Sequence, residues 1–348
     1  MRPMGKAGVS FMRDAIFPNL GSRSPRVLVG PGRGLDNAVV ALRGRDVMIA
    51  TVDPISMVPS LGPELSAWLS VHLIASDYFA SGTSPTFATF SYNFPRAMAG
   101  SERGGYLRAV GRECGKLGVS IIGGHTGSYP GAAFTVVGAG SMLGFARRGG
   151  FVTPAMARAG DAVLMTKHAA IEGAATLALS FPERARERVG KGLAVKAERM
   201  IRLCSTVRDS VVAAREGLGE GAVTSMHDAT EGGVIGGLEE MAAASKKAFV
   251  VEEEAIPVSP AAKAVCAEFG LDPLRTLGEG ALLITCSPDS VGGLKARMAR
   301  ARIAVAELGA VRAGRGLLLR RKGGGESLEG PVDDRYWEAY ARASKGRN

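Results

Sequence analysis

Short apolar segments alternate with longer amphipathic segments along most of the chain, and this alternation restricts the fold class more than any other feature. Short apolar runs are typical of strands, and apolar residues at three- and four-residue spacing predict helices. Neither a helix bundle nor a β-sandwich has this alternation. The 348 residues are more than twice the ~150 typical of one domain. We therefore expect an α/β (α+β) protein with two domains.

The expected elements follow from these periodicities. Strands are predicted at Ala38–Leu42, Val47–Val52, Val119–Ile122, Phe134–Val137, Ala162–Met165, Phe249–Glu252, Ala281–Thr285, Ile303–Leu308 and Leu317–Leu319. Helices are predicted near Pro63–Ala80, Glu102–Leu117, Ile171–Leu179, Leu193–Glu216, Val234–Ala244, Pro260–Phe269, Val291–Ala301 and Tyr336–Ala343.

The best position for a domain junction is Phe145–Gly160. There, Arg147-Arg148-Gly149-Gly150 and Pro154 interrupt the alternation of apolar and amphipathic segments. We expect an N-terminal domain at residues 1–150 and a C-terminal domain at 155–322. Residues 323–348 are expected to be a tail with a short helix, in which the polar segments Gly323–Leu328 and Ala343–Asn348 are loose.

Charge and composition narrow the possible partners. The 43 basic and 33 acidic side chains give a net charge of +10, which favours anionic partners. Aromatic residues make up only 6% and do not interleave with the basic segments, so we do not expect nucleic acid as the partner. No uncharged apolar run reaches the ~18 residues of a membrane span. Four widely separated cysteines favour a reducing compartment, and we expect a cytoplasmic protein.

Glycine is the compositional outlier, with 48 residues or about twice the usual ~7%. One cluster is the segment Gly30–Asn37, which leads into an apolar run. The amides of such a loop can bind phosphate oxygens, and Asp36 could hold a magnesium ion shared with those phosphates. The segment contains no Walker A sequence, and an exposed turn is the alternative.

Two acids stand near the ends of predicted elements. Asp53 follows the strand Val47–Val52, and ligands of open α/β sheets bind at such strand ends, although an acid before a proline can also simply start a turn. Asp77 lies in the same helical stripe as two leucines and near the helix C-terminus, where the macrodipole disfavours an anion by ~0.3–1 kcal/mol. We expect a magnesium ion or an arginine to compensate Asp77.

Three further segments could contact an anion. Gly123–Gly127 follows a predicted strand, and Lys167 follows another and could reach a phosphate as a point charge. The segment His227–Gly237 places four glycines in the first turns of a helix, which costs about 1 kcal/mol each relative to alanine. Close approach of a phosphate or of a neighbouring domain would explain that cost, and tight packing without a ligand is the alternative.

The order of these motifs resembles the aminoimidazole ribonucleotide (AIR) synthase-related, or PurM-like, superfamily of ATP-binding proteins, in the branch that includes the hydrogenase-maturation protein HypE. The motifs that carry the resemblance are Gly34-Leu35-Asp36-Asn37, Thr51-Val52-Asp53, Ala75-Ser76-Asp77, Gly123-Gly124-His125-Thr126 and Asp228-Ala229-Thr230-Glu231-Gly232-Gly233. Gly160–Lys167, Ile256-Pro257-Val258 and Gly278-Glu279-Gly280 extend it.

The resemblance implies a PurM-like fold whose N-terminal domains form a shared β-barrel across a homodimer, with ATP and Mg²⁺ as cofactors. It implies Asp36, Asp53, Asp77 and Asp228 as metal ligands. Asp53, Asp77 and Lys167 are the candidate catalytic residues. The candidate nucleotide-binding residues are Gly32, Gly34, Asn37, Gly123, Gly124, His125, Thr126, Thr230, Gly232 and Gly233.

The implied function is an ATP- and magnesium-dependent enzyme that transfers a phosphoryl group to a small anionic substrate. A thiamine-monophosphate-kinase-like enzyme, an AIR-synthase-like cyclo-ligase and a non-catalytic nucleotide-binding partner protein are the alternatives. Leu35 and His125 stand where many relatives have aspartate, which bears on the number of metal ions. HypE acts on a C-terminal cysteine, whereas the last cysteine here is Cys286, so we expect a different acceptor.

Overall fold

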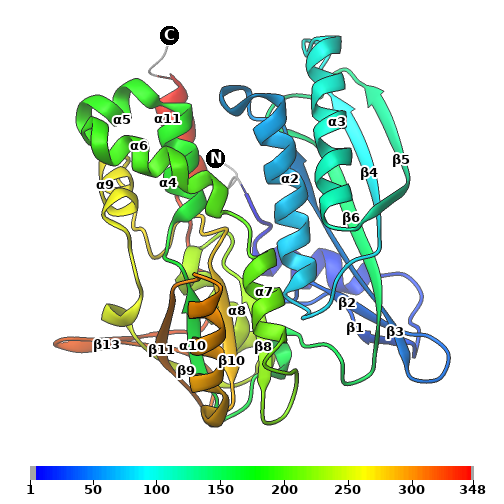
Figure 1. Cartoon of the computed structure of the whole chain (residues 1–348), viewed down its shortest axis with the longest axis vertical. Coiled ribbons are helices and arrows are strands. Elements are labelled where there is room, and N and C mark those ends of the chain that lie inside the picture. The colour runs from blue at the N-terminus through cyan, green and yellow to red at the C-terminus, as the bar shows by residue number, and fades with distance from the viewer. Residues whose placement is uncertain (1–4, 346–348) are drawn as a thin grey trace.

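The computed structural model describes residues 5–345 and contains two β-sheets, one in each half of the chain (Figure 1). The first sheet has the strand order β1-β2-β3-β6-β4-β5. Its strands are β1 (Val27–Val29), β2 (Ala38–Ala41), β3 (Asp46–Ser56), β4 (Phe87–Phe94), β5 (Ser120–Ser128) and β6 (Val136–Arg147). Only the β4–β5 pair is parallel among the pairings of this sheet. The helices α2 (Gly62–Phe79) and α3 (Gly100–Lys116) pack on it.

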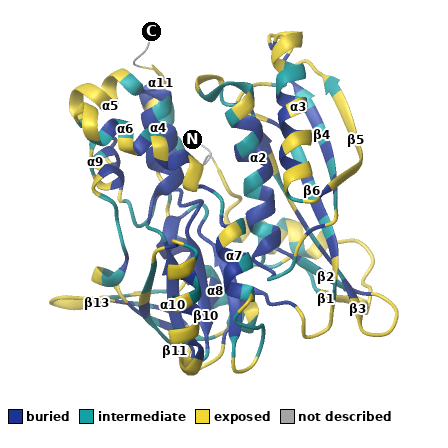
Figure 2. Cartoon of the chain, in the orientation of Figure 1, coloured by how far each residue is buried: buried dark blue, intermediate teal, exposed yellow. Residues whose placement is uncertain are grey.

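Alternating burial explains how this sheet meets its helices. Val47, Ile49 and Ile55 of β3 are fully buried and pack in one cluster with Ile74 and Tyr78 of α2. Side chains of successive strand residues point to opposite faces, so the intervening residues face away from the helices. Figure 2 shows the consequence for the edge strand β5, which is exposed along its length.

The second sheet has the strand order β13-β12-β9-β11-β7-β10-β8. Its strands are β7 (Ala162–Thr166), β8 (Val223–Asp228), β9 (Ala248–Glu252), β10 (Leu282–Cys286), β11 (Val305–Arg312), β12 (Gly316–Arg321) and β13 (Gly324–Leu328). Strands β7, β8 and β10 are buried along their whole length, because separate apolar clusters pack on their two faces.

The remaining helices surround the second sheet or form a separate helical layer above it (Figure 1). Near the sheet lie α7 (Val207–Ala214), α8 (Gly233–Ser245) and α10 (Val291–Arg300). The helical layer contains α4 (Ile171–Ser180), α5 (Pro182–Arg188), α6 (Lys191–Arg199), α9 (Pro260–Glu268) and α11 (Tyr336–Lys345). The short α1 (Val9–Phe11) belongs to the N-terminal segment.

The expected α/β fold with two domains is confirmed, and most of the predicted helices are present. The helix predicted over Leu193–Glu216 is wrong, because the segment is divided into α6, the 3-10 turn Met200–Leu203 and α7. Lys167 stabilises this break between the helices, because its Nζ donates to the carbonyls of Leu203 and Ser205, at 3.1 and 2.8 Å.

Two expectations about residues near strand ends need correction. The segment Gly123–Gly127 is not a loop but part of β5, since its glycine backbone pairs in register with β4. Asp53 does not follow a strand but lies inside β3. Because β2 begins at Ala38, opposite Ala50, the residues of β3 after Ala50 form an edge on that side and tolerate Pro54, which has no N–H to donate.

The segment Gly323–Leu328 was expected to be loose, but β13 occupies Gly324–Leu328 and pairs with β12 throughout. Residues 346–348 of the expected tail lie outside the described residues. Strands β1, β4 and β8 were not predicted, and β6 runs far beyond the predicted Phe134–Val137.

Within residues 5–345, no helix combines the length and the hydropathy that crossing a bilayer requires. All four cysteines are buried as free thiols.

Candidate metal and nucleotide site

Six carboxylates from both halves of the chain lie close enough together to interact electrostatically, and we call them the acidic cluster. They are Asp36, Asp53, Asp77, Glu172, Asp228 and Glu279. Asp36 precedes β2, Asp53 lies on β3 and Asp77 lies in the last turn of α2. Asp228 ends β8, Glu172 lies in the first turn of α4 and Glu279 precedes β10. The four aspartates implied by the sequence therefore meet at one place.

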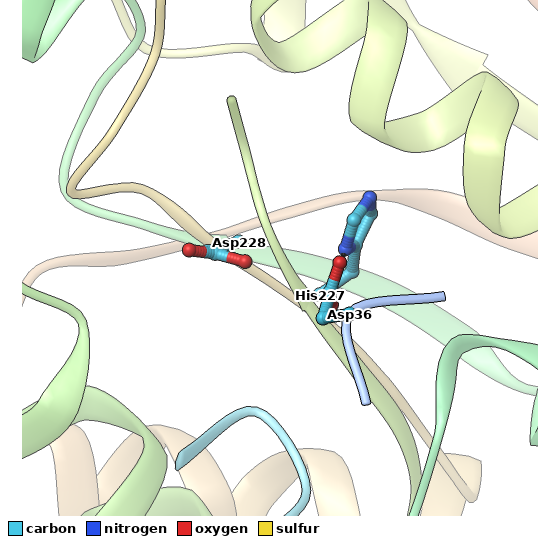
Figure 3. A group of neighbouring side chains, drawn as sticks. All are labelled: Asp36, His227 and Asp228. Carbon is cyan, nitrogen blue, oxygen red and sulfur yellow. Dashed lines mark hydrogen bonds and ion pairs between the residues drawn. The ribbon is translucent and has the colours of Figure 1, made fainter. Parts of the chain in front are cut away.

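His227 connects the cluster to α8. Its Nδ1 lies 2.7 Å from Asp36 Oδ2 and its Nε2 lies 3.1 Å from Glu240 Oε2, and Figure 3 shows the Asp36 carboxyl directed at the ring. Burial disfavours the charged imidazole, but Asp36 and Glu240 outweigh it and raise the pKa of His227 to about 10. His227 is therefore an imidazolium with both nitrogens donating.

Asp228 is the carboxylate of the cluster whose hydrogen-bonding capacity is least satisfied. It is completely buried, and neither of its side-chain oxygens accepts a hydrogen bond in the described part of the chain. Burial, followed by the charge of Asp36, raises the pKa of Asp228 to about 7. A buried ionised carboxylate without partners costs several kcal/mol, so the charged form is unfavourable unless a cation binds, and without one the carboxyl takes up a proton.

Burial also raises the pKa values of four other carboxyls of the cluster. Burial raises the pKa of Asp53 to about 7 and that of Glu172 to about 8, and neighbouring carboxylates add to both shifts. The pKa values of Asp77 and Glu279 are also raised, first by burial and then by the charge of Asp228. Asp77 Oδ2 has a long contact of 3.4 Å with Thr51 Oγ1. The cluster is thus a region of concentrated negative potential inside a basic protein.

Lys6 supplies positive charge to this region. Its Nζ lies 3.1 Å from Glu240 Oε1, and its backbone N–H donates to Glu231 Oε2 at 2.5 Å. Glu231 also accepts from Trp337 Nε1 at 3.0 Å, so segments near both ends of the chain meet there. The charge of Lys6 lowers the pKa of Asp77 against the larger raising effects. Lys6 therefore supplies part of the positive charge near Asp77, and a magnesium ion at this acid stays a prediction.

A cavity of about 530 Å³ opens beside the cluster. The N-terminal segment, the loop Pro31–Asp36, the start of α8 and residues 331–334 line it. The predicted Gly32 and Gly34 belong to this lining, as do Glu231 and Gly232. Its size lies within the ~300–1,000 Å³ of small-molecule sites.

The chemistry of the cluster fits Mg²⁺. Carboxylate oxygens are the donors that this hard cation prefers, and the two unpartnered oxygens of Asp228 are available to it. His227 has a nitrogen within 4.8 Å of the oxygens of Asp36 and Asp228, but both its nitrogens are engaged with carboxylates. The fitting ligands are therefore the carboxylates, and Asp36 and Asp228 have oxygens within 4.8 Å of each other.

The structure does not bring every candidate residue to the cluster. Asp53 pairs with Gly140, Gly140 with Phe90, and Phe90 with Gly124, so Gly124 lies three strands from Asp53. At ~4.8 Å per strand, this separation is about 14 Å. His125 Nε2 instead contacts Tyr129 Oη at 2.5 Å. Nucleotide contact by Gly123, Gly124, His125 and Thr126 stays a prediction.

Lys167 also has a different environment from the one expected. Its Nζ is 3.2 Å from Asp209 Oδ2 and donates to the carbonyls of Leu203 and Ser205. These contacts attach the start of α7 to the end of β7. A direct catalytic role of Lys167 stays a prediction.

The glycines before and within α8 have a packing explanation. A Cβ on Gly233 would lie 2.6 Å from Leu274 O, and its φ is +63°. A Cβ on Gly232 would lie 3.2 Å from Gly236 Cα, and one on Gly34 would lie 2.6 Å from Glu240 O. Close approach of the protein's own backbone therefore accounts for glycine at these positions.

Sequence reasoning did not select several residues that shape the site. Glu172 and Glu279 both stand next to glycine at the edge of an apolar segment, which is a weak signal. Lys6 and the ring of His227 join the site through contacts with residues more than a hundred positions away, and Glu240 joins it through its contacts with these two residues. No local pattern reveals these contacts.

Asn37 and Thr230 lie at the margin of the cluster with unsatisfied oxygens. Asn37 Nδ2 donates to Asp77 O at 2.7 Å, while its Oδ1 has no partner among the described residues. Thr230 Oγ1 is likewise buried without a described partner. Both oxygens are available to a ligand.

Comparison with known proteins gives two family matches that together span most of the chain. Residues 34–146 match the AIR synthase related protein, N-terminal domain, and residues 158–322 match the AIR synthase related protein, C-terminal domain. A carbamoyl dehydratase HypE of Bradyrhizobium diazoefficiens is 27% identical over 76% of this chain and 74% of its own length. A thiamine-monophosphate kinase of Nitrosopumilus maritimus is 25% identical over 84% of this chain and 89% of its own.

Solved structures show the same fold at lower identity. AaThiL complexed with AMPPCP and TMP has a TM-score of 0.69 at 20% identity and covers 92% of this chain and 96% of that one. The hydrogenase maturation protein HypE in complex with ATP has a TM-score of 0.67 at 20% identity and covers 95% and 96%. The chain belongs to the AIR synthase-related family.

Proposed function

We propose that this protein is an ATP- and Mg²⁺-dependent enzyme that transfers a phosphoryl group from ATP to a small anionic acceptor. The observation that carries the proposal is the buried carboxylate of Asp228, unpartnered among the described residues, in a cluster of acids beside a glycine-lined cavity. Relatives in this family that are solved with ATP or AMPPCP support the choice of nucleotide.

Asp36 and Asp228 would hold Mg²⁺, together with Asp53 and Asp77 from the first half of the chain. When bound, Mg²⁺ neutralises phosphate charge as it develops during the transfer. The amides of Gly32 and Gly34 line the adjacent cavity and can donate to phosphate oxygens. His227 contacts the Asp36 carboxylate and fixes its orientation, so its contribution is to position this metal ligand.

Glu279 is the best candidate for accepting a proton from the acceptor. It is buried, its Oε2 has no partner in the described residues, and its raised pKa makes its carboxylate a stronger base than an exposed one. Glu172 is the neighbouring acid that contributes to this shift.

The acceptor is an external molecule in this proposal. Burial raises the pKa of Cys114, Cys266 and Cys286 to about 12 and also raises that of Cys204, so none of the four provides a thiolate near neutral pH. This feature favours a kinase-like or cyclo-ligase-like reaction over one that uses a thiol of these residues. The kinase relative also covers more of both chains than the dehydratase does.

A homodimer is part of the proposal. Val52, Ile122, Val136 and Phe145 of the first sheet are between 52% and 66% exposed, and they lie on β3, β5 and β6. A second copy that pairs with this sheet would cover them and protect the edge of β5. Analytical ultracentrifugation of the wild type and of the variant Val52→Lys/Phe145→Lys tests this proposal. The wild type should sediment as a dimer and the variant as a monomer, and a monomeric wild type would contradict the proposal.

Calorimetric titration tests the nucleotide site. ATP with Mg²⁺ should bind the wild type, and binding should weaken at least tenfold in Asp53→Asn and in Asp228→Asn. The exposed Asp289→Asn serves as the control, because Asp289 lies in the turn before α10, outside the cluster. Binding that is absent, or equal in all variants, would contradict the proposal.

Measurement of ADP release in the presence of candidate acceptors distinguishes the possible functions. Acceptor-dependent ADP release with a phosphorylated product indicates a kinase, and a cyclised product with released phosphate indicates a cyclo-ligase. ATP binding without turnover for any acceptor indicates a nucleotide-binding partner protein.

A further inference from the structure

A second hollow, of about 390 Å³, lies between α7 and α10 and has the opposite charge from the acidic cluster. Figure 1 shows α7 between α2 and α10, with the hollow's two helices adjacent. Its lining consists of arginines and small apolar residues: Arg208, Val211, Val212, Arg215, Arg297, Arg300 and Ala301. None of these residues takes part in the proposed nucleotide site.

Helical spacing brings the arginines together. Arg208 and Arg215 are seven residues apart and Val211 lies between them, so all three share one stripe of α7. At 1.5 Å per residue, the two arginines are about 10 Å apart along the helix axis. Arg297 and Arg300 lie three residues apart on α10 and share a face in the same way.

The charges of the hollow are mostly unneutralised. Arg297 Nε donates to Glu216 Oε2 at 2.6 Å, which orients its guanidinium. Arg208, Arg215 and Arg300 have no ion pair or side-chain hydrogen bond with any of residues 5–345. Three guanidinium groups therefore surround one small hollow without a counter-charge from the described chain.

Helix stability does not explain this arrangement. Arg215 and Arg300 stand at helix C-termini, where the macrodipole favours a cation. Arg208, however, lies in the first turn of α7, where the macrodipole disfavours a cation. An anion bound beside this exposed side chain would offset that unfavourable interaction.

The lining also indicates the kind of anion. Guanidinium groups match phosphate oxygens with paired donors, and the apolar floor of Val211, Val212 and Ala301 strengthens the field by excluding water. A hollow of this volume suits a small molecule, and its lining has no aromatic ring on which a nucleic-acid base could stack.

We propose that the hollow between α7 and α10 is a binding site for a small polyphosphate anion, separate from the acidic cluster. The site requires no metal ion, because the arginines provide the charge. It is connected to the proposed nucleotide site through α7: the preceding Thr206 N–H donates to Ser76 Oγ at 3.0 Å, next to Asp77, and Asp209 pairs with Lys167.

Titration of the full chain with tripolyphosphate in EDTA tests the site. The wild type should bind, and Arg208→Gln/Arg215→Gln/Arg300→Gln should bind at least tenfold more weakly. The matched control is Arg45→Gln/Arg312→Gln/Arg315→Gln, which removes the same charge from three exposed arginines elsewhere and should stay within twofold of the wild type. Asp228→Asn should also bind like the wild type, which separates this site from the nucleotide site.

Several results would overturn the proposal: no binding by the wild type, equal loss in both triple variants, or loss in Asp228→Asn. A single-stranded oligonucleotide that needs the same arginines and is not displaced by tripolyphosphate would also overturn it. If the triple variant fails to fold by circular dichroism, Arg208→Gln should still weaken binding about threefold, and Arg208→Lys should restore part of it. Unchanged binding in Arg208→Gln would contradict the site.

Discussion

His227 Nδ1 lies 2.7 Å from Asp36 Oδ2. This contact joins β8, an edge strand of the second sheet, to the loop that precedes β2 of the first sheet. The two residues are separated by 191 positions, and both side chains are at most 10% exposed. Glu240 contacts the other nitrogen of the ring, and against the effect of burial the imidazolium and Lys6 together lower the pKa of that acid to about 2. His227 is thus a buried cation between two carboxylates.

Removing this cation should destabilise the protein. In His227→Gln, Asp36 and Glu240 lose their shared positive partner, and breaking such a buried ion pair costs about 3–5 kcal/mol. Urea unfolding monitored by circular dichroism measures the change. The exposed pair Arg13–Asp14 gives the control, and Arg13→Gln should leave the midpoint unchanged. A His227→Gln midpoint equal to that of the wild type would mean that the contact does not stabilise the fold.

Stability should fall as pH rises when divalent ions are absent. Asp53, Asp228 and Glu172 have folded-state pKa values of about 7, 7 and 8, above their ordinary values, so the folded state binds more protons than the unfolded state between pH ~4 and 8. His227, whose pKa is raised to about 10, acts in the same direction above pH ~6.5. Melting temperatures in EDTA should therefore decrease from pH 5.5 to 8.5.

Mg²⁺ should reverse much of this decrease, because it replaces the lost protons as the neutralising charge. The increase in melting temperature caused by Mg²⁺ should be larger at pH 8.5 than at pH 5.5. An increase that is independent of pH, or larger at low pH, would show that the ion does not bind these acids.

Glu279→Gln should separate stability from activity. The amide keeps the size of the side chain and removes a buried charge, so the melting temperature at pH 8 should stay equal or rise. Acceptor-dependent ADP release should fall at least a hundredfold, in line with loss of general base catalysis. Full turnover by Glu279→Gln would remove Glu279 from the reaction, whereas ATP binding in this variant should remain.

The glycines of α8 give a prediction about packing. Gly233→Ala should destabilise the protein by about 1–3 kcal/mol, because φ is +63° and the new Cβ would meet the backbone at 2.6 Å. Gly292→Ala is the opposite control, since its Cβ meets nothing within 4 Å in α10, and alanine should stabilise that helix by up to about 1 kcal/mol. Equal effects of both substitutions in chemical denaturation would contradict the packing account.

Periodicity predicted the fold class, and the order of the motifs pointed to four aspartates that the structure brings close together, while their role as metal ligands stays a prediction. The sequence did not predict β8, which is buried along its whole length and therefore has no alternating pattern. Polar residues there are satisfied inside the sheet: Thr224 and Ser225 bond to Thr285 on β10 at 2.6 and 2.7 Å. Such pairs depend on a neighbouring strand sixty residues away, which a local pattern does not contain.

The candidate loop Gly123–Gly127 failed for a related reason. Consecutive small residues predict a turn, but β5 uses them as an edge strand, where a Cβ on Gly124 would overlap Phe90 O. Residues such as Lys6 and Glu240 could not be predicted, since their role depends on contacts formed only after both halves of the chain have folded together.

The most direct test of the central claim is the binding of Mn²⁺, as a spectroscopic substitute for Mg²⁺, to the nucleotide-free protein at pH 8. Electron paramagnetic resonance counts the free ion during the titration. The account predicts saturable binding to the wild type and to Asp289→Asn, and affinity at least tenfold weaker in Asp228→Asn. Identical titrations of the wild type and Asp228→Asn would contradict the assignment of the acidic cluster as a divalent-metal site.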